Sequence, residues 1–423
     1  MSHATFNTVN SADLYLEYFV LDVPLLPEKR KTAIEIAGRD GSVDFGNESY
    51  APRIITAHAL LKATSEANLT AYLKDIAVWL SGEGYLISDD NTDQRWYGKV
   101  FQMVEQERYP LFLKFKVFFE CQPYATDATE TEAAVIETPT DYASDVEFYP
   151  TINATLYNLE NQCTNGDFPT VTTGWTDVGA DLAIASGACT VTGDGSSATV
   201  ELIQANAAVL DVAHKYYVRA TVSVSNADCL NIKLDYDGST AGTAETNDTQ
   251  ATPENGTSYT LSALDTPPAD AEGAFQINIH HDYADAATAN TKVMTVDNVF
   301  VIDVTSVFGA GSEPSLATMD GYMTTYLAAQ SVTHFTDTLA TSFQVSLAST
   351  GELVLLTDTY ANEDVLEINM STGKVTKNAA NCMDKVSLTS TFFGVPTGEQ
   401  TITVTSDGFY LADMDYYKRY LYA

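Results

Sequence analysis

Alternating hydrophobic and polar positions run through most of the chain, which is the pattern of half-buried β-strands. In the first 125 residues it predicts strands over 14–22, 31–38, 53–63, 86–89, 92–107 and 111–124. One stretch differs, because apolar residues recur there at helical spacing and Gly82 follows. It predicts a helix over 67–82, and we expect its apolar stripe to pack on the neighbouring sheet.

The pattern changes along the rest of the chain. Residues 126–145 are acidic, rich in Thr and Ala and weakly patterned, which predicts a linker. From 158 to 334, short alternating strands separated by Gly, Asn and Asp turns are typical of a β-sandwich. The second half of 308–330 predicts a short helix, and strands resume over 342–423.

Charge separates the middle of the chain from its ends. The 57 acidic and 21 basic residues give a net charge of −36. Residues 126–335 alone hold 29 acids and 4 bases. Such a surface repels nucleic acid and anionic membranes, so we expect neither as a partner. The sharp change in charge favours an inserted domain.

The remaining composition excludes several classes of site. The five cysteines have no CxxC spacing, which argues against a zinc or redox site. Cys163 and Cys189 could form a disulfide, although small buried thiols are the commoner reading. The first 20 residues lack a signal-peptide pattern, and no apolar run is long enough to span a membrane.

Three segments of the two ends resemble the distal tail protein family, the baseplate hub of long, flexible-tailed phages. The first is GRDG at 38–41 with Tyr50 and the helix ending IAVWL at 76–80. The second is FECQPY at 119–124. The third comprises EDVLEIN at 363–369, FFGVPTG at 392–398 and TITV at 401–404.

This resemblance implies a ring-forming N-terminal belt domain over 1–125 and a galectin-like sandwich. A Pro-Thr-Ile strand at 150–152 lies about 180 residues before the later strands of that sandwich, where the family runs on directly. The sandwich is therefore expected to be split into 146–157 and 335–423, with 158–334 inserted. By the same resemblance we expect a homo-hexameric ring in the virion tail tip, made in the host cytoplasm. Its partners would be the tail tube protein and a tail tip or tail-associated protein.

The insert resembles a jelly-roll carbohydrate-binding module, through NGDF at 165–168, Gly174-Trp175 and VDNVF at 296–300. In such modules a structural calcium lies between the early turn and the late strand, and Asp167 and Asp297 match its ligands by position. Calcium prefers oxygen ligands such as these carboxylates.

Aromatic rings stack on sugars, and polar neighbours bond their hydroxyls. The candidate sugar-binding residues are Trp175, Tyr216, Tyr236, His281 and Tyr283. Trp175 is more simply read as packing beneath the preceding turn. Because neighbouring strand residues face opposite sides, His280 and His281 should not share a metal ion. For the same reason one of Tyr216 and Tyr217 should face in and the other out.

No catalytic motif is present: the chain lacks GxSxG, HExxH, a P-loop and a dinucleotide fingerprint. Asp235-Tyr236-Asp237 and Glu363-Asp364 read more simply as solvated acids than as acid/base pairs. We therefore expect no enzyme but a tail hub whose insert adheres to a host cell-surface polysaccharide. Two alternatives remain: a secreted or surface β-rich adhesin or lectin, and a hub whose insert is only a spacer or protein-contact domain.

Overall fold

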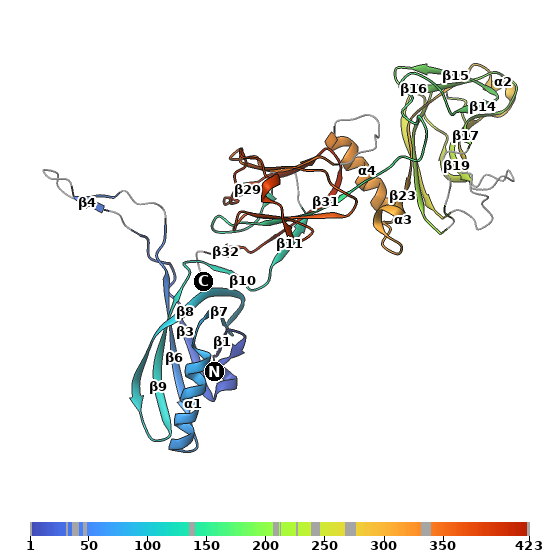
Figure 1. Ribbon diagram of the computed structural model, residues 1–423. Coiled ribbons are helices and arrows are strands. Elements are labelled where there is room, and N and C mark those ends of the chain that lie inside the picture. Colours follow the sequence, from blue (N-terminus) through green and yellow to red (C-terminus); the bar gives the residue numbers. More distant parts are fainter. Residues whose placement is uncertain are drawn as a thin grey trace.

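The computed structural model describes residues 2–30, 33–35, 42–44, 49–134, 140–205, 211, 213–225, 227–237, 246–266, 276–330 and 340–420. Strands dominate these residues, which confirms the mainly β fold class expected from the sequence. Figure 1 shows three bodies: an N-terminal domain, a central sandwich carrying the last strands, and an inserted domain at the far side of that sandwich.

The N-terminal domain is built on one long antiparallel sheet. Its strand order is β2 (Val9–Asn10), β1 (Ala4–Phe6), β7 (Glu83–Ser88), β8 (Asn91–Arg108), β9 (Phe112–Cys121), β6 (Arg53–Lys62) and β3 (Leu16–Asp22), with η1 (Ser11–Leu14) between β2 and β3. A separate hairpin joins β4 (Ala33–Glu35) to β5 (Ser42–Asp44), and the rest of the strand expected over 31–38 lies outside the described residues.

Helix α1 (Glu66–Trp79) confirms the helix predicted at this position. Ser65 caps it, since its hydroxyl accepts a hydrogen bond from the Asn68 amide at 3.2 Å. The predicted apolar stripe packs on the sheet, where Trp79 contacts the rings of Phe6 and Phe19. The Trp79 indole N–H donates to the Phe6 carbonyl at 2.9 Å, so the buried ring has no unmet donor.

The segment 126–145 is not the plain linker that its composition suggested. It contributes three short strands, β10 (Ala125–Asp127), β11 (Thr131–Ala134) and β12 (Thr140–Asp141), and Tyr142 lies in the sandwich core. β10 pairs with β8 and with β32 (Arg419–Tyr420), so the C-terminal strand meets the N-terminal sheet. Local composition missed this because the strands are edge strands held by distant partners.

The central sandwich is built from strands that precede the insert in sequence and strands that follow it. One sheet has the order β11, β31 (Phe409–Tyr416), β13 (Thr151–Tyr157), β26 (Asp364–Asn369), β27 (Lys374–Lys377) and β28 (Ala380–Asn381). The other has β25 (Leu353–Thr357), β24 (Ser342–Leu347) and β30 (Ile402–Ser406), while β29 (Glu399–Gln400) pairs with β12 and η2 (Met383–Lys385) follows β28. Because β13 lies between β26 and β31, a strand before the insert is central to a sheet made mostly of strands after it.

The insert is a sandwich of two five-stranded antiparallel sheets. Sheet 1 has the order β15 (Ala180–Ala185), β16 (Ala188–Gly193), β23 (Val293–Asp303), β18 (Tyr216–Val224) and β21 (Ser258–Asp265). Sheet 2 has the order β14 (Thr176–Val178), β17 (Thr199–Ala205), β22 (Gln276–Asp282), β19 (Asn231–Asp237) and β20 (Thr246–Ala251), and α2 (Ala286–Ala289) follows β22. The inward residues of both sheets form one apolar core. Cys163, Cys189 and Cys229 are free thiols in this core, so the disulfide alternative is wrong.

Helices α3 (Val304–Phe308) and α4 (Leu316–Gln330) join the insert to the sandwich. A separate apolar cluster draws Tyr217, Phe300 and Ile302 from sheet 1, six residues from the helices, and Phe409 from β31. Tyr322 and Tyr326 of α4 contact the Phe409 ring, with centroids 5.9 and 5.7 Å apart. α4 is therefore longer than the short helix expected, and it packs between two domains.

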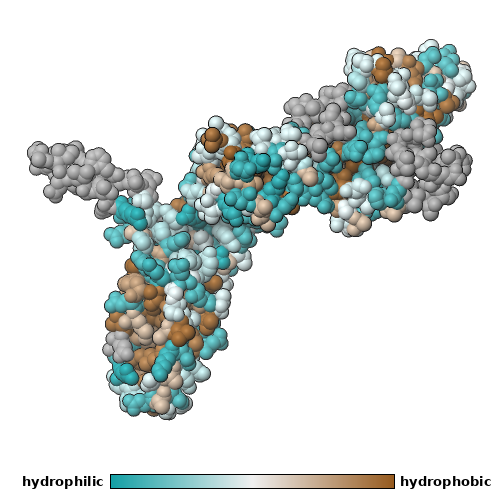
Figure 2. All heavy atoms as spheres, in the orientation of Figure 1, coloured by the Kyte–Doolittle hydropathy of each residue, from teal (hydrophilic) through white to brown (hydrophobic). Residues whose placement is uncertain are grey.

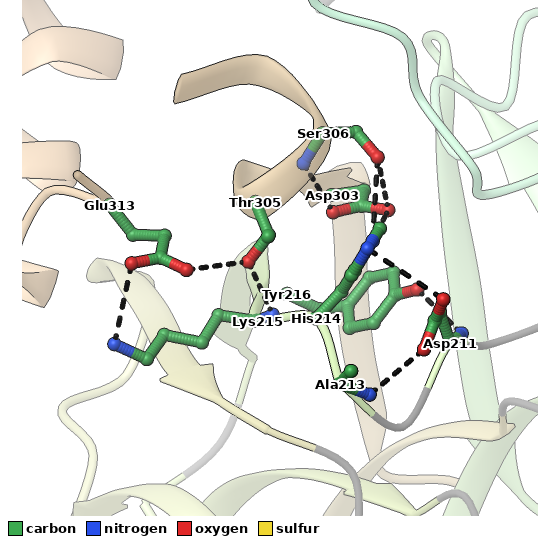
Figure 3. A network of polar contacts seen from close by, with 9 residues as sticks. All are labelled: Asp211, Ala213, His214, Lys215, Tyr216, Asp303, Thr305, Ser306 and Glu313. Carbon is green, nitrogen blue, oxygen red and sulfur yellow. Dashed lines mark hydrogen bonds and ion pairs between the residues drawn. The ribbon is translucent and has the colours of Figure 1, made fainter. Parts of the chain in front are cut away.

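A polar clamp holds α3 and the following turn to the insert, as Figure 3 shows. The Asp303 carboxylate accepts from the Ser306 amide at 2.9 Å, capping α3, and contacts the His214 Nδ1 at 2.8 Å. Thr305 accepts from the Lys215 amide and donates to Glu313, at 2.9 and 2.8 Å. The hydrogen bond to Asp303 raises the pKa of His214.

Candidate functional site

The two sheets of the insert differ in what covers their outer faces. On sheet 1, Tyr217 faces outward, as strand alternation predicted for one of the two tyrosines, yet it is fully buried under α4. Its hydroxyl donates to Asp320 of α4 at 2.6 Å, and Ser262 of β21 donates to the same carboxylate at 3.0 Å. Sheet 2 lies on the side of the insert away from α4 (Figure 1), so its outer face is the candidate binding face.

Strand alternation sorts the residues of β22 between core and outer face. Ile277 and Ile279 belong to the core. Asn278, His280 and Asp282 therefore face outward. The register places Asp235 of β19 opposite Asn278, and Lys233 opposite His280. These five residues and Glu201 of β17 form what we call the polar row.

Hydrogen bonds and ion pairs connect the polar row across three strands. His280 lies between two carboxylates, with Nε2 2.8 Å from Asp235 and Nδ1 3.0 Å from Asp282. Lys233 Nζ is 3.0 Å from the other oxygen of Asp282. The Asn278 amide donates to Glu201 at 3.1 Å. The result is a rigid and largely buried polar network rather than a set of independent side chains.

Charge in the polar row is set by these contacts. Burial alone would lower the pKa of His280, but the hydrogen bonds to Asp235 and Asp282 outweigh burial and raise it to about 9. Burial would likewise raise the pKa of Asp282, yet His280 and Lys233 hold it well below its usual range. With this pKa, His280 carries a positive charge at neutral pH.

Two oxygen atoms of the polar row remain without a donor within the residues that the structure describes. These are Oδ1 of Asp235 and Oδ1 of Asn278, on side chains only 4% and 9% exposed. An unsatisfied buried acceptor is costly, and native proteins contain few of them. A hydroxyl or ammonium group brought to this point would supply the missing hydrogen bonds.

His281 shows how strongly the two faces differ. It points into the core beside Tyr283, whose hydroxyl is 2.9 Å from Nδ1. Burial lowers the pKa of His281 to about 3, so it stays neutral while its neighbour is charged. The expectation that these two histidines share no ion is consistent with this geometry.

Four of the five candidate sugar-binding residues are buried, although contact with a sugar requires an exposed side chain. Trp175, Tyr216, His281 and Tyr283 are all at most 6% exposed and belong to the core or pack against it. Trp175 packs on Phe168 and its N–H donates to the Asn165 carbonyl at 3.2 Å, which matches the simpler reading. A buried ring offers no face to a sugar, so these four are core residues. The side chain of Tyr236 lies outside the described residues.

The turn carrying Asp167 lies against the strand carrying Asp297. The Val299 amide donates to the Gly166 carbonyl at 2.8 Å, and a Cβ on Gly166 would lie 1.8 Å from the Val299 carbonyl oxygen. Only glycine permits this approach, which brings two half-buried carboxylates to neighbouring segments. Among the described residues no three His, Cys, Asp or Glu side chains gather closely enough to hold a metal. A calcium ion here would need backbone carbonyls to complete its oxygen ligands.

Sequence reasoning missed Lys233, Asp235, Asn278 and Glu201 as members of one site. They come from three strands, and only the pairing of β19 and β17 with β22 brings them together. The one available signal was alternation in QINIHHD at 276–282, which places Asn, His and Asp on one face.

The two ends of the chain match known phage protein families. Residues 12–121 match a phage tail protein RIFT-related domain, and residues 323–420 match the C-terminal domain of a siphovirus-type tail component. Each match covers about a quarter of the chain, and neither includes residues 122–322. No curated protein matches the chain in sequence. Both ends of the chain are therefore similar to phage tail proteins.

Among solved structures, the chain is similar to the Dit protein (gp 19.1) of phage SPP1, with 10% identity, 99% of each chain covered and a TM-score of 0.46. It is also similar to a xylan-binding module of Paenibacillus barcinonensis Xyn10C, with 12% identity over 33% of this chain and 97% of that one, and a TM-score of 0.27. A family 22 carbohydrate-binding module of Clostridium thermocellum Xyn10B gives 17% identity, 35% and 98% coverage, and a TM-score of 0.26. The described helices include none long and apolar enough to cross a membrane.

Proposed function

We propose that the protein is the distal tail hub of a long-tailed phage, a non-enzymatic ring at the virion tail tip that presents the insert to the host surface. The observation that carries this proposal is the pair of tail-component domains at the two ends, with a separate sandwich inserted between strands of the second. A hub joins the tail tube to tip proteins, and these are the partners we expect.

A solvent-exposed apolar surface on the N-terminal domain supports assembly into a ring. Val20, Ile54, Phe101 and Val104 are each 37–51% exposed, and Phe101 contacts the half-buried ring of Phe118. Figure 2 shows several apolar side chains on the surface of this domain. Exposed apolar patches on soluble proteins commonly mark subunit contacts, and six copies in a closed ring would cover this one.

The insert is proposed to bind a neutral, hydroxyl-rich polysaccharide through the polar row. The excess of acids in this region repels acidic polymers. Its four basic residues are each already engaged: Lys215 with Glu313, Arg219 with α4 and the Phe300 ring, Lys233 with Asp282, and Lys292 with Asp228. Hydroxyl groups would supply the donors that Asp235 and Asn278 lack. Six weak sites on one ring would bind one polymer together, and the overall affinity would exceed that of a single site.

The sugar-binding role is tested by measuring binding of the purified protein to neutral and acidic polysaccharides of the host wall. We expect binding of a neutral polymer, and loss of at least tenfold in affinity in Asn278→Ala, which removes one orphan acceptor. Thr190→Ala, on the outer face of sheet 1, is the matched control and should bind as the unaltered protein does. If the protein binds none of the host polysaccharides, the sugar-binding role is wrong and the insert is a spacer or a protein-contact domain.

A structural calcium ion between Asp167 and Asp297 is also proposed. Binding to the folded state would raise the melting temperature of the insert. We expect calcium to raise it and a chelator to lower it, and we expect Asp167→Asn with Asp297→Asn to remove both effects. An unchanged melting temperature in calcium and in chelator would contradict this site.

A further inference from the structure

A pocket outside the insert lies where the two ends of the chain meet. It has a volume of about 260 Å³ and is lined by Tyr85, Arg95, Tyr97, Gln122, Tyr124, Thr126 and Tyr417. A second hollow of the same volume shares Tyr97 and Gln122 with it and continues along β8 and the end of β9. Residues of the N-terminal sheet and of the chain between β31 and β32 line the first pocket, and the second hollow adjoins it.

Of the described residues that line the first pocket, Arg95 alone is charged. Its guanidinium lies over the Tyr85 ring, 3.9 Å from the centroid, and over the Tyr417 ring at 4.7 Å. Two rings therefore hold the guanidinium in place, which fixes the direction of its N–H groups.

No carboxylate pairs with Arg95 among the residues that the structure describes, although the chain carries 57 acids. Its buried Nε also has no hydrogen-bond partner there. A guanidinium is built to bind a carboxylate through two parallel hydrogen bonds. A fixed arginine without a carboxylate partner in a tyrosine-lined pocket has the chemistry to bind a carboxylate.

We propose that this pocket binds an acidic side chain, Asp or Glu, presented by a neighbouring protein chain of the assembly. The tyrosine rings favour this over an acidic sugar. Guanidinium groups already lie over Tyr85, Tyr417 and Tyr124, the last under Arg419 at 4.4 Å, so little ring surface remains for a sugar to stack on. The pocket and the hollow that adjoins it can accommodate an extended peptide with one acidic residue in the pocket.

The proposal is tested on the full chain with N-acetyl-glutamate methylamide as the probe, followed by saturation-transfer NMR. We expect saturable binding with a dissociation constant in the millimolar range, as for a single charged contact, and none of the glutamine analogue. Arg95→Gln should abolish binding, while Arg95→Lys should retain part of it. Arg108→Gln removes the same charge from the same strand outside the pocket and should bind the probe normally.

A neighbouring copy could already fill the pocket, so sedimentation of the same variants is measured alongside. Weaker self-association of Arg95→Gln, but not of Arg108→Gln, would then support the proposal. It is overturned if Arg95→Gln changes neither probe binding nor self-association, or if glucuronate binds more tightly than the glutamate probe. The two proposals can fail separately. A strictly monomeric protein that binds the probe through Arg95 would support the carboxylate-binding pocket and contradict the ring-forming hub.

Discussion

The outer faces of the two sheets of the insert differ in the residues that they carry and in what covers them. Sheet 1 turns Tyr217, Phe300 and Ile302 outward, and α4 buries them against the scaffold. Sheet 2 turns Asn278, His280 and Asp282 outward into a network of hydrogen bonds. The way in which the insert is attached therefore decides which of its two sheet faces the scaffold covers.

The attachment also limits how the insert can move. Asn362, in the scaffold, accepts a hydrogen bond from the Asn158 amide at 3.0 Å and donates to the Val307 carbonyl at 3.1 Å. It therefore ties together the chain that enters the insert and the chain that leaves it. With the apolar cluster around α4, this predicts a fixed orientation of the insert on the sandwich rather than a flexible tether.

The largest effect is expected from Phe409→Ala, which removes the scaffold's central ring from the cluster around α4. Loss of a buried Phe costs about 3–5 kcal/mol, and Phe409 is 2% exposed. Denaturation should show the insert and sandwich uncoupled, and small-angle scattering should show a broadened distribution of distances between them. An unchanged scattering profile would contradict the rigid attachment.

Asp320→Ala should destabilise the same joint by about 2–3 kcal/mol, since it leaves the Tyr217 and Ser262 hydroxyls without an acceptor. Asp320→Asn keeps an acceptor oxygen and serves as the control, with a smaller loss. Chemical denaturation of both variants measures the difference. Equal losses would mean that the carboxylate contributes through its charge and not through these hydrogen bonds.

His280 and His281 make the stability of the insert depend on pH in opposite directions. The pKa of His280 is raised to about 9, so its contribution to stability is complete below about 6.5 and is lost as pH rises through 9. The pKa of His281 is lowered to about 3, so the protein loses stability as pH falls below about 6.5. Melting temperatures across pH should therefore fall on both sides. His280→Asn should flatten only the alkaline side, and His281→Asn only the acid side.

The smallest effect is expected from Lys292→Ala, a residue that belongs neither to the joint nor to the polar row. Its ion pair with Asp228 is partly exposed, at 2.5 Å, and such pairs contribute about 0–1 kcal/mol. The variant should keep both polysaccharide binding and the orientation of the insert. A loss of either would show that the two regions are less separate than the contacts indicate.

Much of the fold could be predicted from the sequence because its signals are local. The helix at 66–79 follows from apolar spacing and a Ser cap, and the insertion follows from the change in charge. The polar row could not be predicted, because Asp235 and His280 are 45 residues apart and meet only through strand pairing. The burial of the aromatic candidates could not be predicted for a related reason: alternation does not tell which face of a strand is covered, and Tyr216 and Tyr283 turn into the core.

Electron microscopy of the purified full chain tests whether six copies form a ring that holds its inserts in fixed positions. We expect rings of six subunits, each of 45.8 kDa, with six outward lobes that stay sharp after averaging. Monomers at high concentration would contradict the hub, and rings with blurred lobes would contradict the rigid attachment through α4.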